Sequence, residues 1–374
     1  MTKTFRPTWA EVNLGALKYN YNQIQRLVGR DVKLMVVVKA NAYGHGLVEV
    51  SKALAKMGVD YLGVATVDEA LLLRKRRLRK PILVLGSILP DEVGAALKNN
   101  ISLTLANNEL LNIIEKKADS LKTTCRVHIK IDTGMGRIGA WHEDEAELLI
   151  DKTISSKSID VEGVYTHFSS AARDKVYTSY QIESFENLIG KLLNRNFNIP
   201  YRHAANSIAT VNLKRSHLNL VRPGLIVYGM YPKKGFKRFI NLKPVLSLKT
   251  KIVYLKNVPP GRSISYGRTY LTQEHTRIAT LPIGYADGYG RILSNKAEVL
   301  VKGEKAPVVG KVTMDQTMID VGHIEDVKIG DEVVLIGRQG KNEITTERLA
   351  RLAGTIPYEI VCSITDRVPR IYKR

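Results

Sequence analysis

Residues 36–46 read Val-Val-Val-Lys-Ala-Asn-Ala-Tyr-Gly-His-Gly, so that a lysine, Lys39, directly follows an apolar, β-branched run. The run predicts a buried strand over 34–38. A lysine at the end of such a strand loses solvation unless it is paired, neutral or covalently used. Burial lowers the pKa of a lysine and frees its amine for Schiff-base chemistry. The alternative is a lysine that extends from the strand end to solvent, and spacing alone does not separate the two. The glycines at 44 and 46 would let the backbone approach a ligand and start a helix.

The same alternation of apolar runs and amphipathic stretches continues outward from this segment to about residue 230. Regular strand–helix alternation predicts parallel βα units. Some eight strands over this length favour an α/β fold of the closed (β/α)8 TIM-type barrel class, with an open doubly wound sheet as the alternative. The expected strands are 34–38, 61–65, 82–85, 102–105, 126–131 and 161–166, with weaker ones near 201–203 and 219–221. The expected helices are 11–27, 46–57, 67–77, 91–98, 107–117, 143–151 and 179–194.

The pattern changes after residue 240, where short runs rich in Val, Thr and Gly are separated by turn residues. These runs predict a mostly β C-terminal domain. We therefore expect a barrel over 1–240 and a second domain over 241–374. The expected strands of the second domain lie in 246–254, 276–282, 298–301, 306–312 and 332–336.

Composition excludes several classes of protein. The chain has 374 residues, 44% hydrophobic and 25% charged, which is an ordinary globular composition. The sequence contains no run of eighteen apolar residues, so it predicts no membrane span. The start of the chain lacks the apolar core of a signal peptide, so we expect a cytoplasmic location. The two cysteines make neither a disulfide framework nor a zinc set, and we expect no metal.

The formal net charge of +21 is the one unusual number. Its basic residues are spread at nearly equal density over both parts of the chain, without a basic arm. The densest cluster, residues 74–80, follows an expected helix and precedes Pro81. Cations at a helix C-terminus complement its dipole, so we interpret this cluster as a solvated helix end rather than a nucleic-acid or anion patch.

Polar residues follow several expected strands at the point where each strand ends. Lys130 and Asp132 follow in this way, as do His167, the pair Asn206 and Ser207, and Arg222. In a barrel of this kind the C-terminal ends of the strands carry the active site. One such residue would often be structural, but with Lys39 there are polar groups at five strand ends, and together these indicate a functional site.

These segments, in this order, resemble the pyridoxal-phosphate-dependent alanine racemases of bacteria over nearly the whole chain. The resemblance rests on the Lys39 segment and eight further motifs: Lys-Ile-Asp-Thr-Gly-Met-Gly-Arg at 130–137, Thr-His-Phe at 166–168, Ala-Asn-Ser at 205–207, Arg-Pro-Gly at 222–224, Ser-Tyr-Gly-Arg at 265–268, Ile-Gly-Tyr-Ala-Asp-Gly-Tyr at 283–289, Met-Asp-Gln at 314–316 and Pro-Tyr-Glu at 357–359. There are two departures. Thr313 stands where relatives often have Cys or Ser, and Ser-Ser-Ala-Ala-Arg-Asp follows Phe168 where a shorter Ala-x-Ala-Asp is expected.

The resemblance implies a homodimer with shared active sites that interconverts L- and D-alanine and supplies D-alanine for peptidoglycan. Lys39 would hold pyridoxal 5'-phosphate as an aldimine. Its phosphate would be held by Tyr43, Ser207, the backbone of Gly224 and Leu225, and Tyr358. Arg222 would contact the pyridine nitrogen, and His167 and Asn206 would be further cofactor-binding residues. Arg137 would orient the substrate carboxylate. Tyr266, Met314 and Asp315 would come from the partner subunit. In some relatives the lysine that matches Lys130 is carbamylated.

Racemisation through this site would use two bases, one on each face of a planar intermediate. The resemblance assigns Lys39 to the D-isomer and Tyr266 to the L-isomer. A tyrosine with a pKa of about 10 needs a nearby cation or donor to act as a base, which His167, with Arg222 behind it, could supply. The alternatives are a broader-specificity racemase or an amino-acid decarboxylase on the same scaffold. More distant alternatives are a cofactor carrier without catalysis and a nucleic-acid-binding protein. We expect no specific nucleic acid and no membrane among the partners.

Overall fold

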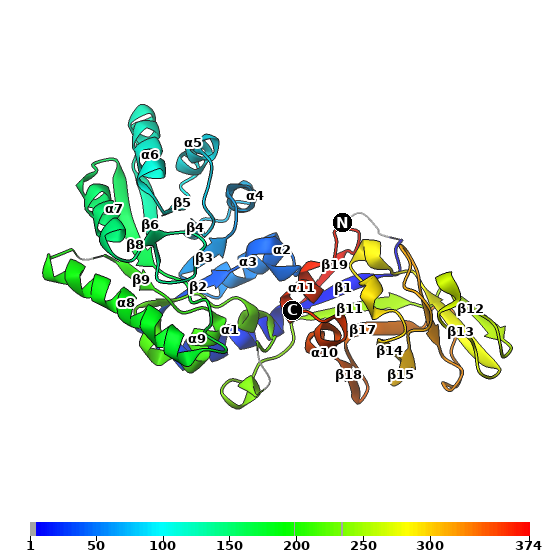
Figure 1. The fold of residues 1–374 in the computed structure, drawn as a ribbon. Helices are drawn as coiled ribbons and strands as arrows, with labels where there is room; N and C mark the ends of the chain where they lie inside the picture. Colours follow the sequence, from blue (N-terminus) through cyan, green and yellow to red (C-terminus); the bar gives the residue numbers. More distant parts are fainter. Residues whose placement is uncertain (1–4, 198, 233–234) are drawn as a thin grey trace.

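The computed structural model describes residues 5–197, 199–232 and 235–374. Figure 1 shows an elongated molecule with a barrel at one end and a strand-rich domain at the other. The short helices α2 (Lys39–Tyr43) and α11 (Pro357–Cys362) meet between the two parts. Within the described residues, no helix is both long and apolar enough to cross a membrane.

Eight parallel strands form the barrel, as the strand–helix alternation predicts. Their order around it is β10-β2-β3-β4-β5-β6-β8-β9. Backbone hydrogen bonds connect the two ends of this order, since Asn219 N–H donates to Arg202 O (3.4 Å) and Arg222 N–H to Ala205 O (2.9 Å). The strands are β2 (Lys33–Val37), β3 (Tyr61–Val64), β4 (Ile82–Val84), β5 (Ser102–Leu105), β6 (Cys125–Asp132), β8 (Ile159–Tyr165), β9 (Tyr201–His203) and β10 (Leu220–Val221), with the short β7 (Ala140–Trp141) beside β6.

Several of the barrel helices begin where a polar side chain caps them. Asn13, Thr66, Asn107 and Asp174 each accept a hydrogen bond from an N–H of the first turn, which satisfies a donor that has no intrahelical partner. The helices are α1 (Leu14–Val28), α3 (Leu47–Lys56), α4 (Val67–Lys75), α5 (Pro90–Lys98), α6 (Asn108–Leu121), α7 (Asp144–Ser155), α8 (Lys175–Asn194) and α9 (Ser207–Asn212), with 3-10 turns η1 (Lys214–His217), η2 (Leu225–Tyr228) and η3 (Phe236–Arg238).

The second domain is mostly β, as predicted. Its larger sheet has the order β15-β14-β17-β11-β1-β19, with β18 beside β17, and a smaller sheet has the order β12-β13-β16. Apolar residues of both sheets share one core. The elements are β1 (Trp9–Asn13), β11 (Leu246–Lys251), β12 (Tyr254–Val258), η4 (Tyr266–Arg268), β13 (Thr276–Leu281), η5 (Tyr285–Asp287), η6 (Arg291–Leu293), β14 (Glu298–Val301), β15 (Glu304–Pro307), β16 (Thr317–Asp320), β17 (Glu332–Gln339), β18 (Asn342–Ile344), α10 (Thr346–Ala353) and β19 (Arg370–Lys373).

The first strand departs from the expected division at residue 240. The predicted helix over 11–27 was wrong at its start, because residues 9–13 form a strand of the second domain's sheet. β1 pairs antiparallel with β11 and parallel with β19. Its burial alternates, with Ala10 and Val12 fully buried, and this period of two is the physical signature of a half-buried strand. The chain therefore starts in the second domain and enters the barrel at α1.

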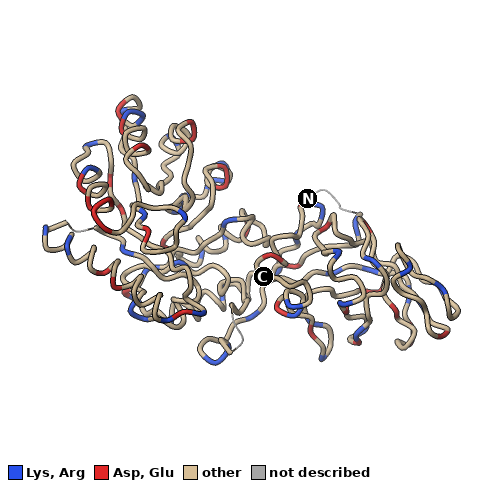
Figure 2. Tube along the Cα trace, viewed as in Figure 1, with Lys and Arg blue, Asp and Glu red and all other residues tan. Residues whose placement is uncertain are grey.

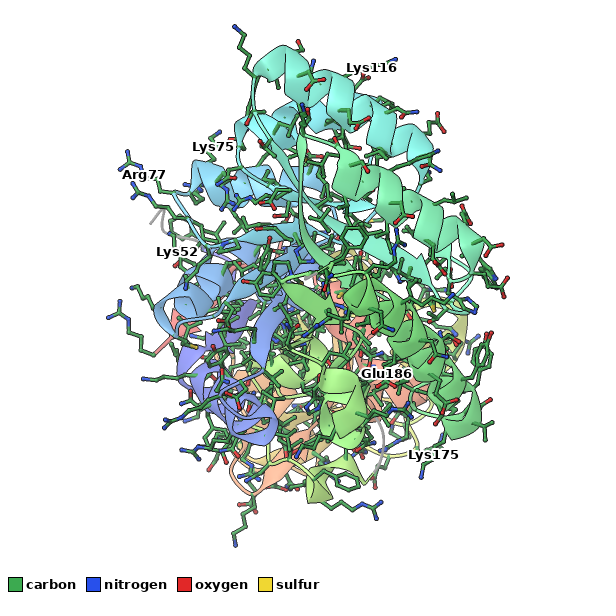
Figure 3. All side chains as sticks on the ribbon, turned by 90° about the vertical axis from the view of Figure 1, so that its left-hand side faces the viewer. Lys52, Lys75, Arg77, Lys116, Lys175 and Glu186 are labelled. Atoms are coloured by element: carbon green, nitrogen blue, oxygen red, sulfur yellow. The ribbon has the colours of Figure 1, made fainter. Side chains whose placement is uncertain are left out.

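Basic residues are distributed over both domains, as Figure 2 shows. Figure 3 shows Lys52, Lys75, Arg77, Lys116 and Lys175 extending outward from the barrel surface. Residues 74–80 cover the C-terminal end of α4, where the Arg74 guanidinium donates to the carbonyls of Leu78, Lys80, Asn99 and Asn100. The structure thus agrees with the interpretation of this cluster as a helix end.

Candidate active site

A cavity of about 570 Å³ lies at the C-terminal ends of the barrel strands. It brings together residues that are far apart in the sequence, among them Lys39, Lys130, His167, Asn206, Ser207 and Arg222, which the strand-end pattern singled out. Its polar lining comprises Lys39, Tyr43, Lys130, Arg137, Tyr165, His167, Asn206, Ser207, Arg222, Gly224 and, from the far end of the chain, Tyr358 and Cys362. Leu225, fully buried, follows Gly224 at the start of η2.

Lys39 begins an unusual backbone turn after β2. Ala40, Asn41, Ala42 and Tyr43 all have φ between 52° and 54°, a left-handed conformation that costs about 1–2 kcal/mol per residue. Side chains hold the turn, because Glu69 accepts the Ala40 N–H (2.7 Å) and Asn41 Oδ1 accepts the Leu47 N–H (2.8 Å). Burial, assisted by the charge of Arg137, lowers the pKa of Lys39, as a lysine that acts as a nucleophile requires.

The C-terminal segment packs against this turn and explains its glycines. A side chain on Gly44 would lie 2.0 Å from the Val361 carbonyl oxygen, and one on Gly46 would lie 1.8 Å from the Tyr372 hydroxyl. The sequence suggested that these glycines let the backbone approach a ligand. In the structure they instead let the C-terminal segment pack closely against the turn. As a result the Tyr358 ring reaches the cavity, 5.7 Å from the Tyr43 ring.

Four groups form a cradle at one side of the cavity: Tyr43, Ser207, Gly224 and Tyr358. The Gly224 N–H donates to Ser207 Oγ (2.9 Å). A side chain on Gly224 would lie 2.5 Å from the Tyr43 hydroxyl, so glycine keeps this space open. Burial raises the pKa of Tyr43, and that of Tyr358 to about 12, so both hydroxyls stay protonated and able to donate near neutral pH. Asn206 caps α9 by accepting the N–H groups of Ile208 and Ala209, which fixes Ser207 at the first position of that helix.

Arg222 lies at the centre of a buried polar network. Its guanidinium donates to Thr166 O (2.7 Å) and Ala204 O (3.1 Å) and contacts His203 Nδ1 (2.9 Å) and His167 Nδ1 (3.3 Å). Burial lowers the pKa of Arg222 only to about 10, so the side chain stays charged at neutral pH. Burial and the nearby charge of Arg222 hold the pKa of His167 well below its usual range, so its imidazole is neutral.

The network continues through the barrel interior to Glu162. His203 Nε2 lies 2.8 Å from His128 Nδ1, and His128 Nε2 lies 3.7 Å from Glu162 Oε2, beyond hydrogen-bond range. Burial lowers the pKa of both histidines. Arg222 can only donate, so His203 Nδ1 accepts and His203 carries its proton on Nε2, which donates to His128 Nδ1. His128 then carries its proton on Nε2, so both neutral histidines direct their N–H groups toward Glu162. Burial alone would raise the pKa of Glu162, but His128 and the Ser102 and Tyr61 hydroxyls (2.6 Å each) lower it to about 2.

Arg137 enters the cavity from a loop that Asp132 organises. The Asp132 carboxylate accepts the backbone N–H groups of Gly134, Met135, Gly136 and Arg137 at 2.7–3.1 Å. Lys130, two residues before Asp132 in β6, is buried, and its amine donates a hydrogen bond to the Ile131 carbonyl (3.0 Å). Burial, followed by the charge of Arg222, lowers the pKa of Lys130 to about 7, which leaves a large neutral fraction at physiological pH.

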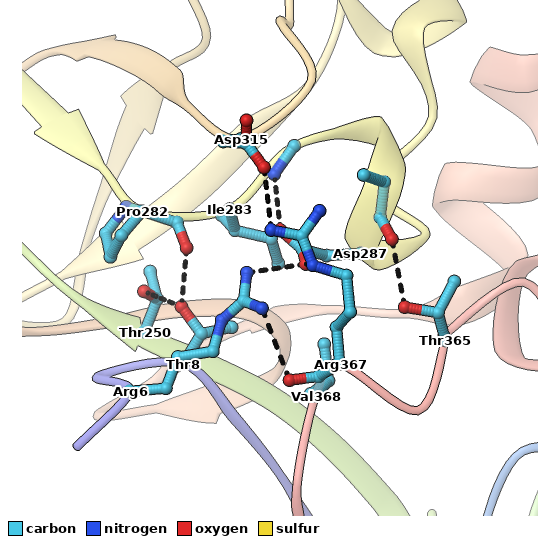
Figure 4. Close-up of polar contacts among 12 residues, drawn as sticks. Arg6, Thr8, Thr250, Pro282, Ile283, Asp287, Asp315, Thr365, Arg367 and Val368 are labelled. Carbon is cyan, nitrogen blue, oxygen red and sulfur yellow. Dashed lines mark hydrogen bonds and ion pairs between the residues drawn. The ribbon is translucent and has the colours of Figure 1, made fainter. Parts of the chain in front are cut away.

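Three of the predicted residues lie in the second domain instead of the cavity. Tyr266, Met314 and Asp315 are 72%, 53% and 56% exposed. Figure 4 shows how Asp315 is held: Arg367 binds it at 2.7 Å and also contacts the buried Asp287 at 3.4 Å. The backbone carbonyls of Thr313 and Met314 accept the N–H groups of Tyr285 and Ala286, so these loops form one ordered surface.

Sequence reasoning missed several residues of the site. Glu162 and His128 lie inside strands rather than at strand ends, and the only available signal was a charged or polar residue in an otherwise apolar run. Tyr165 stacks on His203 at 4.7 Å and lies under Lys130 and Arg222. Cys362 reaches the cavity only because α11 packs on α2, which no local pattern encodes.

Comparisons with known proteins agree with this geometry. Residues 12–232 match the model of the alanine racemase N-terminal domain, and residues 245–372 match that of the C-terminal domain. The alanine racemase of Halothermothrix orenii is 48% identical over 98% of this chain and 97% of its own length. Among solved structures, the alanine racemase of Clostridium difficile 630 has a TM-score of 0.94 at 42% identity, covering 99% and 97% of the two chains. That of Bacillus anthracis, solved with bound L-Ala-P, has 0.94 at 40%, covering 100% and 96%. Barrel, second domain and sequence together place this chain in the alanine racemase family.

Proposed function

We propose that this enzyme interconverts L- and D-alanine with pyridoxal 5'-phosphate bound to Lys39. The observation that carries the proposal is the placement of Lys39 and Arg222, an amine of lowered pKa and a fixed cation, in one cavity at the C-terminal face of the barrel. Relatives named alanine racemase over the full length of the chain support alanine as the substrate.

The residues fit this cofactor. The cradle of Tyr43, Ser207, Gly224 and Tyr358 would hold its phosphate, with Leu225 offering a further backbone N–H at the start of η2. The open space beside Gly224, which a side chain at this position would fill, supports this fit. When bound, the cofactor supplies electron withdrawal that makes the α-proton of the amino acid acidic.

Arg222 would favour racemisation over competing reactions. Its guanidinium stays charged and carries only donors, so it would contact the pyridine nitrogen without protonating it. The contacts of Arg222 with His203, and of His203 with His128, fix this guanidinium in place. An acidic residue at this point would protonate the ring, strengthen its electron withdrawal and favour decarboxylation or transamination. Arg222 therefore argues against the decarboxylase alternative.

Lys39 and Tyr266 would be the two bases, the second supplied by a partner subunit. Within one chain, Tyr266 lies exposed on the second domain, so the cavity needs a second copy to complete it. Lys39 would take the proton from the D-isomer, and Tyr266, beside the neutral His167, from the L-isomer. Met314 and Asp315 of the partner would adjoin Arg137, which would orient the substrate carboxylate.

We also propose that Lys130 is carbamylated. Its amine is largely neutral because of the lowered pKa, and its nitrogen can add to the carbon of CO2 with loss of one proton to solvent. The resulting anion would lie near two cations, Arg137 and Arg222, which interact electrostatically with Lys130. A carbamate resonance after addition of 13C-bicarbonate, absent from Lys130→Met, would test this.

A racemisation assay with both alanine isomers tests the main proposal. The purified protein with bound cofactor should convert each isomer to the racemate, and Lys39→Ala should not. Exposed Lys175→Ala serves as a control for the loss of one lysine. Absence of turnover by the cofactor-loaded wild type would refute the assignment.

Mixing two inactive variants tests the shared site. In a mixed dimer of Lys39→Ala and Tyr266→Phe, one site combines both changes and the other is intact. Random exchange of subunits should therefore restore about one quarter of wild-type activity, since half of the dimers are mixed and each has one intact site of two. If each chain formed its own complete site, mixing would restore nothing.

A further inference from the structure

Helix α8 touches both catalytic loops of the barrel through a small set of side chains. We call Ser169, Tyr177 and Gln181 the α8 clamp. Tyr177 and Gln181 lie in the N-terminal half of this helix, and Ser169 lies in the loop that precedes it. We infer that the α8 clamp positions Arg137 and His167 relative to each other. The inference rests on the roles proposed for these two residues and extends beyond them.

Gln181 is the centre of the clamp because it is fully buried and uses both ends of its amide. Its Nε2 donates to His167 O (3.3 Å) and to Thr133 Oγ1 (3.4 Å). His167 belongs to one loop and Thr133 to the loop that carries Arg137. A buried amide with partners on two loops fixes the distance between them, since leaving either end unpaired would cost the desolvation of a polar group.

The two remaining residues each hold one loop. Ser169 donates to Gln181 Oε1 through its N–H (3.1 Å) and its hydroxyl (3.2 Å), which holds the loop after His167. Tyr177 donates from its hydroxyl to Gly134 O (3.1 Å), which holds the Arg137 loop. A side chain on Gly134 would lie 2.2 Å from that hydroxyl, so the contact depends on glycine.

The Ser169 hydroxyl contact follows from a departure of this chain. Relatives are expected to have alanine after the Thr-His-Phe motif, which would keep the N–H contact but lack the hydroxyl. The longer loop then turns back through Ser170, whose carbonyl accepts the N–H groups of Arg173 and Asp174, and Asp174 caps α8. The loop is therefore anchored at both ends to the helix that carries Gln181.

Separate kinetic effects are expected because the clamp has two arms. Tyr177→Phe should raise the KM for alanine about fivefold, the effect of one lost hydrogen bond, with kcat retained, because it frees only the Arg137 loop. Ser169→Ala should lower kcat by up to the same factor with KM retained, because it removes the hydroxyl contact of the His167 loop and leaves only its N–H contact to Gln181. Gln181→Met, similar in size but without the amide, should change both constants by about tenfold or more.

Matched controls are Tyr19→Phe, Ser155→Ala and Gln25→Met, whose polar atoms bond elsewhere. Unchanged kinetics in folded, cofactor-loaded Gln181→Met, or equal changes in both constants for Tyr177→Phe and Ser169→Ala, would overturn the inference. If Gln181→Met does not fold, the two single-arm variants at part-exposed positions decide alone. Arg137→Ala and His167→Ala separate the two proposals: if these leave KM and kcat unchanged, the proposed roles fail, whatever the clamp variants do.

Discussion

Replacing Glu162 by glutamine should remove an acid-sensitive part of the stability of the barrel. The carboxylate is 15% exposed and has a pKa lowered from 4.5 to about 2. At about 1.4 kcal/mol per pKa unit, it contributes about 3 kcal/mol to the free energy of unfolding. Because the pKa is lower in the folded state, this contribution is complete above pH 4.5 and is lost as the pH falls toward 2.

The variant should therefore be about 3 kcal/mol less stable than the wild type at pH 7, and about half of this difference should be gone at pH 3. Urea unfolding of the cofactor-loaded protein, at one protein concentration, measures both values. The chain has two tryptophans, Trp9 in the second domain and Trp141 in the barrel. A Trp9→Phe background makes fluorescence report the barrel.

Glu183→Gln at an exposed position provides the matched control, since the Glu183 carboxylate pairs with Arg215 at 3.5 Å and exposed ion pairs contribute little to stability. A Glu162→Gln effect below about 1 kcal/mol at pH 7, or one that stays constant down to pH 3, would refute the account of Glu162 as the anion that ends the Arg222 network.

Three further predictions concern the cavity. Tyr266→Phe should slow the exchange of the α-proton with solvent far more for L-alanine than for D-alanine. Equal losses of exchange rate for both isomers would contradict the assignment of two bases. Arg222→Glu should raise the ratio of transamination to racemisation, measured as pyruvate formed per racemisation event, and an unchanged ratio would contradict the role of Arg222. Ala40→Gly should raise the free energy of unfolding by about 1 kcal/mol, because φ is +52° at this exposed position; no gain in the urea midpoint would show that the left-handed turn is not strained there.

Much of the fold was predictable because its signals are local. The expected strands at 102–105 and near 201–203 match β5 and β9, and the other barrel strands differ from their predictions at the ends. The prediction of a barrel followed by a mostly β domain is confirmed. The exception, β1, is only five residues long, and its partners β11 and β19 are more than 230 residues away. A short alternating segment next to a helix carries too little local signal to reveal such pairing.

The candidate site was predictable where a strand ends in a polar residue, as at Lys39, Lys130, His167 and Arg222. It was not predictable where two distant segments must pack first. Tyr358 came only from the family resemblance, and Cys362 was missed, because α11 reaches the cavity by packing on α2 and Gly44, where the Val361 carbonyl lies against the glycine.

By itself, the sequence determined the barrel, its order of strands and helices, and the polar groups at the strand ends, because period and capping are properties of short segments. Only the tertiary structure decided how those groups interact. Burial sets the pKa of Lys39 and Lys130, the histidine chain runs from Arg222 toward Glu162, and Gln181 holds two loops together. These effects depend on distances between residues that are remote in sequence, and only packing in three dimensions defines those distances.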